Sequence, residues 1–309
     1  MSSEDDGLAS LAEALCRFLD DPMPGEGTLL QQDDYKRQRA KLLNKHLNPR
    51  GYRIKSVNPA PVQEALDYKL YLYPETERPA APRYVNIGAG GWSHPYWHNL
   101  DMSSEHYGQK QTAEFIEINL LEDRPLPLES GALAAAYTSH VVEHLPDYAD
   151  QRMFDEVYRA LEPGGYFRIT CPDHEMLLNA YRQGDVQYLA ELQPHLRGRP
   201  AENHLVGYMA TAIAWKYSAE EIREIFDTKP MEEAFEFFTS QIDPAGNAAH
   251  PGWHMNWMSP AKLERMLRKA GFTEIYESRP LQSRCPAMRH PRLFDQAGHG
   301  VSLFVEARK

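Results

Sequence analysis

Histidine and glutamate are concentrated in one short stretch, 139–144, whose sequence is Ser-His-Val-Val-Glu-His. Histidine titrates near neutral pH and can remove a proton from a reacting group. The spacing of His140, Glu143 and His144 is also the inverted zincin pattern, in which two imidazoles on one helix bind zinc. Here the motif follows a strand-like run directly, and Pro146 interrupts it. We therefore predict His140 and His144 as catalytic candidates. A zinc hydrolase that uses these three residues remains an alternative.

A second group of rings lies in the segment 250–257, whose sequence is His-Pro-Gly-Trp-His-Met-Asn-Trp. Such rings can hold a sugar, an aromatic ring or a cationic amine by stacking and cation–π contact. Its His254 is a third candidate for accepting a proton. The segment could equally fold on its own aromatic core, and a metal site made by His250 and His254 is a further alternative.

Two strand-like runs end in residues that could hold a nucleotide cofactor. The run 84–87 stops at Gly88 and Gly90, which allow a sharp turn and a close approach of a ligand to the backbone. The next run ends at Asp101, whose carboxylate could accept hydrogen bonds from both ribose hydroxyls. NAD would fit the same carboxylate, but its fingerprint needs a third glycine where this chain has Ser93. Asp101 could also be a helix N-cap without a ligand.

Composition narrows the class of protein. The chain has 309 residues, a net charge of -11 and three cysteines without paired spacing. The acidic balance argues against a nucleic-acid partner, and the cysteines argue against a disulfide framework. We see no signal peptide and no apolar run of the roughly 20 residues that span a bilayer. We therefore expect a cytoplasmic protein without a membrane span.

Strand-like and helical runs alternate through the middle of the chain. Strands are expected at 84–87, 99–101, 118–120, 134–138 and 166–170, with a helix over 151–161 that ends in Pro-Gly-Gly. A last helix begins after Ser259 and ends at Gly271, and two strands follow it. The segment 91–97 is too short and proline-broken for a crossover helix. The pattern predicts an α/β fold with a doubly wound, mostly parallel, Rossmann-like sheet.

Two further regions lie outside this alternation. Helical spacing over 7–20 and 31–46 predicts an N-terminal helical cap, residues 1–80, that covers the site or mediates a homodimer. The main domain would be 81–309. Within it, 175–256 contains several helical patterns, near 175–182, 185–192, 203–216, 219–227 and 231–238, and is expected to be an inserted lid that shapes the substrate site.

Four motifs in order carry a family resemblance. They are Asn-Ile-Gly-Ala-Gly at 86–90, Asn-Leu-Asp at 99–101, the stretch 139–144, and Leu-Glu-Pro-Gly-Gly at 161–165. This series resembles the class I S-adenosylmethionine (SAM) dependent methyltransferases, and in particular the type 11-like branch. The resemblance covers about 83–173 and 257–309. It implies SAM as cofactor and methyl transfer to an oxygen or nitrogen of a small molecule or glycan. A non-catalytic SAM-binding partner or sensor protein is the alternative.

The resemblance also implies roles for single residues. The glycine bend would lie against the methionine part of SAM, Asp101 on the ribose, and the 119–120 corner on the adenine. The residues at 139–140 would lie beside the sulfonium, with His140 or a histidine of the insertion as general base. The expected cofactor-binding residues are Asn86, Gly88, Ala89, Gly90, Asp101, Asn119, Leu120 and Ser139. The expected catalytic residues are His140, His144 and His254, and no metal ion is expected.

Overall fold

The computed structural model describes residues 81–103, 114–192, 198–247, 249–298 and 300–309, together with residues 39 and 44. The expected N-terminal helical cap over 1–80, with its two helices, therefore lies outside the described residues. Within the described ranges, no helix combines the length and the apolar character that a membrane crossing requires.

Seven strands form one sheet in the order β3-β2-β1-β4-β5-β7-β6. Their bounds are β1 Tyr84–Ile87, β2 His98–Asp101, β3 Phe115–Glu117, β4 Leu133–Ser139, β5 Leu161–Pro172, β6 Glu274–Ser278 and β7 Ser302–Arg308. The first five strands are parallel, and β7 is antiparallel to both β5 and β6. The order reverses between β1 and β4, where Val85 pairs with His98 on one side and Ala136 on the other. Ligands bind outside the carboxyl ends of the strands at such a reversal.

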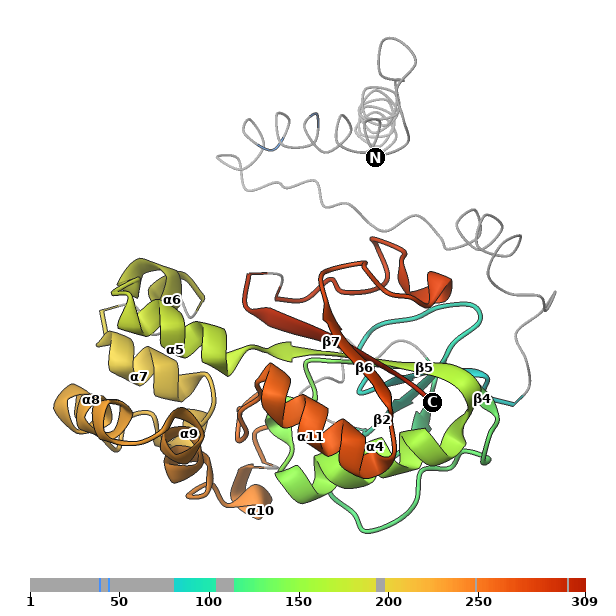
Figure 1. The fold of residues 1–309 in the computed structure, drawn as a ribbon, viewed down its shortest axis with the longest axis horizontal. Coiled ribbons are helices and arrows are strands. Elements are labelled where there is room, and N and C mark those ends of the chain that lie inside the picture. Colours follow the sequence, from blue (N-terminus) through green and yellow to red (C-terminus); the bar gives the residue numbers. More distant parts are fainter. Residues whose placement is uncertain are drawn as a thin grey trace, which may run out of the picture. The chain divides into compact units, whose positions relative to one another are not determined.

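Helices α4 (Asp147–Ala160) and α11 (Pro260–Ala270) pack against one face of this sheet (Figure 1). Strand side chains alternate between faces, so Val85 and Ile87 point toward these helices and pack with Phe154. The expected start and end of the last helix are confirmed. Ser259 accepts a hydrogen bond from the Lys262 backbone N–H, and the helix ends at Gly271 with a left-handed φ of 115°.

Three element boundaries differ from the prediction. Helix α4 begins at Asp147 rather than at 151, directly after Pro146, because proline suits the start of a helix. Strand β5 already begins at Leu161, so the Pro-Gly-Gly segment lies inside the strand and a bulge accommodates it. Strand β3 ends at Glu117, which leaves Ile118 and Asn119 in the loop above the sheet.

The opposite face of the sheet carries a cluster of rings. Tyr84 and Tyr137 alternate with the residues of the first face and pack with Trp97 and Phe294. The segment 91–97 contains no helix, as expected from its prolines. Among the residues that the structure describes, this face is covered by loops and by the single turn η5 (Pro286–Met288) rather than by crossover helices.

A block of helices follows β5 and precedes α11, on the left in Figure 1. Its elements are α5 His174–Arg182, α6 Val186–Leu192, α7 Ala201–Gly207, η4 Thr211–Ile213, α8 Ala219–Thr228, α9 Met231–Thr239 and α10 Pro244–Asn247. These helices share a core of their own that includes Leu205 and Phe235. The helix expected over 203–216 is instead α7, which stops at Gly207, followed by η4. The N-terminus of α8 is held by a capping box of Ser218 and Glu221.

His174 joins this block to the sheet and makes the fold sensitive to acid. Its Nδ1 accepts a hydrogen bond from Met258 N–H at 2.9 Å, so the proton is on Nε2, which donates to Tyr208 O at 3.0 Å. Burial lowers the pKa of His174 from 6.5 to about 4. Because the folded state resists protonation, the stability from His174 is complete above pH 6.5 and is lost as the pH falls toward 4.

We expect the His174→Gln variant to lose less stability than the parent between pH 6.5 and 4. The difference has an upper bound of about 3 kcal/mol, since one pKa unit corresponds to about 1.4 kcal/mol. Urea unfolding of both proteins across this pH range measures it. Parallel pH curves for parent and variant would show that His174 titrates normally in the folded state.

Candidate functional site

A cavity of about 320 Å³ lies at the carboxyl ends of β1, β2 and β4. Seven of the predicted residues line it, namely Gly88, Gly90, Asp101, Asn119, Leu120, His140 and His144. Its other walls include Met102, Val141, Asn247, Pro251 and Met255, which we did not single out as site residues. Of these, Pro251 and Met255 belong to the ring-rich segment 250–257, so that segment was the available signal.

Two glycines form the bend after β1, and their backbone conformation explains why glycine is favoured at both positions. Gly88 and Gly90 have φ values of 69° and 55°, in the left-handed region. A Cβ on Gly88 would lie 2.3 Å from Cγ2 of Val141, so the backbone of β1 and the loop after β4 approach each other closely here. At Gly90 a Cβ would meet no atom within 4 Å. The surface around Gly90 therefore stays open to a ligand.

This contrast gives a prediction for two matched variants. Gly90→Ala should lose only about 1–2 kcal/mol of stability, the cost of left-handed backbone for an L-residue. Gly88→Ala should lose clearly more, because the new methyl also displaces Val141. Urea unfolding of both variants tests this, and adding Val141→Ala to Gly88→Ala should recover the excess. Equal losses for Gly88→Ala and Gly90→Ala would contradict the close approach.

Asp101 is the last residue of β2, and its carboxylate holds the glycine bend in place. Oδ2 accepts a hydrogen bond from Gly90 N–H at 2.6 Å, and Oδ1 accepts one from Met102 N–H at 2.7 Å. No helix begins in the described residues that directly follow, 102–103, so the N-cap alternative gains no support. A carboxylate offers about four lone-pair positions, so two remain for a ligand in the cavity.

The loop after β3 forms another wall of the cavity. Asn119 Oδ1 accepts from Leu121 N–H at 3.0 Å, and its Nδ2 donates to Glu122 Oε1 at 3.2 Å. Asn119 is therefore a turn residue that also lines the cavity beside Leu120.

The structure does not bring Asn86, Ala89 and Ser139 into the lining of this cavity. Asn86 shares the sheet face of Tyr84, which follows from strand alternation, and its buried Oδ1 has no hydrogen-bond partner among the described residues. Ser139 Oγ accepts a hydrogen bond from Thr170 Oγ1 at 2.7 Å, so it is tied to the neighbouring strand β5. A cofactor role for these three residues remains a prediction.

His140 has an unusual backbone and both of its ring nitrogens are engaged. Its φ is 55°, its Nδ1 lies 2.9 Å from Glu143 Oε1, and its Nε2 lies 2.8 Å from Ser302 Oγ. Burial lowers the pKa of His140, but the hydrogen bond and the charge of Glu143 outweigh it, and the pKa lies above its ordinary value. His140 is therefore poorly placed to accept a proton from a substrate.

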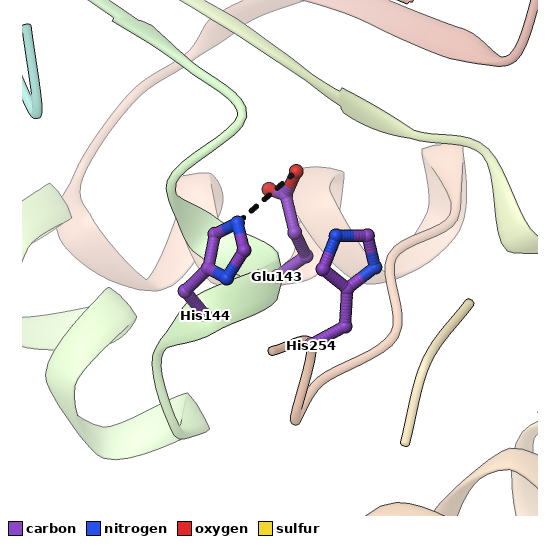
Figure 2. A group of neighbouring side chains, drawn as sticks. All are labelled: Glu143, His144 and His254. Atoms are coloured by element: carbon purple, nitrogen blue, oxygen red, sulfur yellow. Dashed lines mark ion pairs between the residues drawn. The ribbon is translucent and has the colours of Figure 1, made fainter. Parts of the chain in front are cut away.

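Glu143 and His144 lie on the single turn η2 (Val142–His144), and His254 comes from the segment before α11 (Figure 2). His144 Nδ1 lies 3.0 Å from Trp253 O, and His254 Nδ1 lies 2.5 Å from Tyr208 O. The two imidazole rings are 4.8 Å apart between centroids. Burial lowers the pKa of His254 to about 4, so this ring is neutral at physiological pH. The zincin alternative requires His140 and His144 on one helix with both rings facing the zinc. Here His144 lies on a single turn, and the Nε2 of His140 is bound to Ser302 instead.

A second cavity, of about 880 Å³, lies beside the first within the helical block. His254 lines this second cavity, together with Tyr208, Trp215 and Trp253. Arg199 lies over the Trp215 ring at 4.8 Å, and His250 stacks on Trp253 with 3.9 Å between ring centroids. The aromatic and cationic groups are thus arranged around a space and are not only packed on one another. Arg199 had no signal in the sequence.

One family model and several solved structures are similar to parts of this chain. A family model described as a methyltransferase domain matches residues 96–169. A similar solved structure is a SAM-dependent methyltransferase from Methanosarcina mazei, which is 16% identical over 77% of this chain and 98% of that chain, with a TM-score of 0.39. Another is a protein from Thermotoga maritima described as a possible histamine N-methyltransferase, which is 15% identical over 81% of this chain and 96% of that chain, with a TM-score of 0.37. Human N-acetylserotonin methyltransferase in complex with SAM is 13% identical over 74% of this chain and 47% of that chain, with a TM-score of 0.34. No curated protein matches the chain.

The residues around the first cavity fit SAM. The open backbone at Gly90 and the spare lone pairs of Asp101 suit an amino-acid group and a ribose, and the apolar side chain of Leu120 suits a purine ring. The strand order places this cavity at the reversal point, and the matched methyltransferase-domain region, 96–169, contains β2 to β4 and α4. Residues 96–169 therefore match a methyltransferase domain, and SAM is the cofactor that the cavity beside them fits.

Proposed function

We propose that the enzyme methylates an oxygen or a nitrogen of a small molecule or glycan. The observation that carries this proposal is the placement of two neighbouring cavities on either side of one polar cluster. His144 lines the cavity that contains Asp101, and His254 lines the cavity with the tryptophans, while their rings lie 4.8 Å apart. A cofactor in the first cavity and an acceptor in the second would then meet at these two histidines.

SAM supplies an electrophilic methyl group on a sulfonium. The chain's part is to hold the two reactants in line and to keep water out, which can account for most of the rate enhancement of such a transfer. Asp101 would hold the ribose, and the backbone at Gly88 and Gly90 the amino-acid end. Asn119 and Leu120 would hold the adenine. Asp101 also fixes the Gly90 amide, so one residue positions two parts of the cavity.

The acceptor's chemical class is proposed from the walls of the second cavity. Trp215 and Trp253 expose 47% and 37% of their surfaces, which is unusual for side chains of this size. Flat rings of this kind stack on sugar or aromatic groups, and Arg199 could pair with a carboxylate or phosphate on the acceptor. The net charge of -11 disfavours a nucleic acid as the acceptor.

His144 and His254 are better placed than His140 to act on the acceptor's proton. Each has its Nδ1 bound to a backbone carbonyl, and no hydrogen bond to its Nε2 is found among the described residues. Removal of a proton by a histidine contributes to rate when its Nε2 can reach the acceptor atom. A homodimer through the N-terminal helices and a cytoplasmic location remain proposals that rest on the sequence.

The test is a direct one. Calorimetry with SAM, followed by assays for S-adenosylhomocysteine release in the presence of hydroxylated small molecules, amines and glycans, should show SAM binding and turnover with at least one acceptor class. Mass spectrometry of the product identifies the methylated atom. Transfer to carbon, or tight SAM binding with an acceptor that is a nucleic acid, would contradict the proposal.

A further inference from the structure

Glu143, His144 and His254 bring three potential metal-ligand atoms to one place. One ligand atom of each residue lies within 4.8 Å of those of the other two, and His144 Nε2 is 3.9 Å from Glu143 Oε1. In Figure 2 the carboxylate lies between the two imidazole rings. Ligand atoms bound to one ion at about 2.1 Å lie within about 4.2 Å of one another, so small side-chain rotations suffice to close the site.

The backbone partners of the two histidines fix which nitrogen is free. A carbonyl oxygen only accepts, so Nδ1 of His144 donates to Trp253 O and Nδ1 of His254 donates to Tyr208 O. Each neutral ring therefore carries its lone pair on Nε2. Histidines that bind metal ions are typically held in this way, with the second ring nitrogen donating to a carbonyl or carboxylate.

Glu143 is a buried carboxylate whose second oxygen has no hydrogen-bond donor among the residues that the structure describes. It has no exposed surface, and Oε2 has no hydrogen-bond partner within the described part of the chain. His140 Nδ1 lies 2.9 Å from Oε1 and orients the carboxylate. The other ring nitrogen of His140, Nε2, lies against Ser302 Oγ. A buried carboxylate with a free oxygen is costly unless a cation or a donor satisfies it. A bound divalent ion would supply that charge.

Backbone hydrogen bonds hold the two distant segments together at this point. The carbonyl of Glu143 accepts from the N–H groups of Met255 and Asn256, at 2.8 and 3.1 Å. The N–H of His254 donates to Thr211 Oγ1 at 3.0 Å. The cluster is therefore a built site, positioned by η2, by η4 and by the segment before α11.

We propose that Glu143, His144 and His254 bind a divalent first-row transition-metal ion, and that an oxygen of the acceptor is a further ligand. Two imidazoles and one carboxylate suit such an ion and leave coordination positions open. The inference rests on the proposed function and narrows it to a hydroxylated acceptor. A coordinated hydroxyl loses its proton more readily, because the ion stabilises the oxyanion, and the proton passes to solvent. His144 and His254 then act as ligands, and no histidine has to act as the base.

Metal binding can be measured without any turnover. After removal of metals with a chelator, the full chain is titrated with Co²⁺, followed by its visible absorption, and with Zn²⁺ and Mn²⁺ by calorimetry. We expect one Co²⁺ per chain in the parent and an affinity at least about 10-fold weaker in His254→Ala and in Glu143→Gln. His250→Ala is the matched control, because its ring stacks on Trp253 outside the cluster, and it should bind Co²⁺ like the parent.

Circular dichroism and calorimetry with SAM on each variant separate the possible results. A parent that binds SAM but takes up none of the three ions, or a folded His254→Ala that binds Co²⁺ as tightly as the parent, overturns the metal site and leaves the proposed function standing. Failure of the parent to bind SAM would count against the proposed function instead. If Glu143→Gln does not fold, His254→Ala alone decides.

Discussion

Replacing Asp101 with alanine is expected to weaken SAM binding by at least about 100-fold. Hydrogen bonds to a charged group contribute about 1.5–3 kcal/mol each, and two ribose hydroxyls would lose theirs together. A loss of about 3 kcal/mol already corresponds to more than 100-fold in Kd. The variant also frees the Gly90 N–H, which now donates to Oδ2 at 2.6 Å, so the glycine bend loses its anchor. Calorimetry with SAM measures the effect.

Glu117 offers a matched control for this experiment. It ends β3 as Asp101 ends β2, and the two residues pair in register across the strands. Its carboxylate accepts from Ser103 N–H and Oγ at 2.9 and 2.6 Å, and it is absent from the lining of the cofactor cavity. Glu117→Ala should therefore bind SAM like the parent. A folded Asp101→Ala that binds SAM within about threefold of the parent would remove Asp101 from the cofactor site.

The position of the glycine bend and of Asp101 at one edge of the sheet could be predicted because it depends on local sequence. A strand that stops at glycine, and a second strand that stops at a carboxylate, place both groups at one edge whenever the two strands are parallel neighbours. Asn86 shows where this reasoning stops. Its position in the motif suggested the cofactor, yet alternation along β1 puts it on the same face as Tyr84. Counting strand parity from the apolar residues would have given that result.

The pairing of His254 with Glu143 and His144 could not be derived from spacing. His254 is more than 100 positions away from Glu143 and His144 in the sequence. The two segments meet because the Glu143 carbonyl accepts hydrogen bonds from the N–H groups of Met255 and Asn256. No local pattern encodes such a long-range backbone contact. The histidine-rich stretch predicted chemistry but not this grouping, because His140 contacts Glu143 and Ser302, while the ring beside His144 is that of His254.

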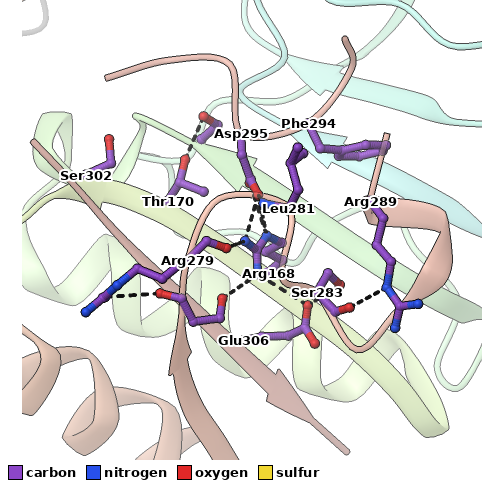
Figure 3. A network of polar contacts seen from close by, with 12 residues as sticks. Arg168, Thr170, Arg279, Leu281, Ser283, Arg289, Phe294, Asp295, Ser302 and Glu306 are labelled. Atoms are coloured by element: carbon purple, nitrogen blue, oxygen red, sulfur yellow. Dashed lines mark hydrogen bonds and ion pairs between the residues drawn. The ribbon is translucent and has the colours of Figure 1, made fainter. Parts of the chain in front are cut away.

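A second site that the sequence did not reveal lies on the other face of the sheet, where Arg168 of β5 is fully buried (Figure 3). Its Nη2 donates to Asp295 Oδ2 at 2.7 Å and its Nε to Oδ1 at 3.0 Å, while Nη1 lies 3.5 Å from Glu306 Oε2. Asp295 Oδ2 also accepts from Leu281 N–H at 2.7 Å. One buried guanidinium thus ties the C-terminal loop to strand β5. Two acidic groups share that single positive charge.

Arg168→Met is therefore expected to lower the free energy of unfolding by about 3–5 kcal/mol, because it leaves Asp295 buried without its charged partner. Arg265→Met is the control. Arg265 makes an equally short two-bond pair with Glu232, at 2.8 and 2.9 Å, but both side chains are exposed, and such pairs contribute about 1 kcal/mol or less. Urea unfolding gives both values. Adding Asp295→Asn to Arg168→Met should cost less than the sum of the two single changes, since the second change removes the unpaired charge. If Arg168→Met costs no more than Arg265→Met, burial does not make this pair essential, and the other contacts of the loop, such as the hydrogen bond from Asp295 N–H to Tyr137 Oη at 2.9 Å, suffice to hold it to the sheet.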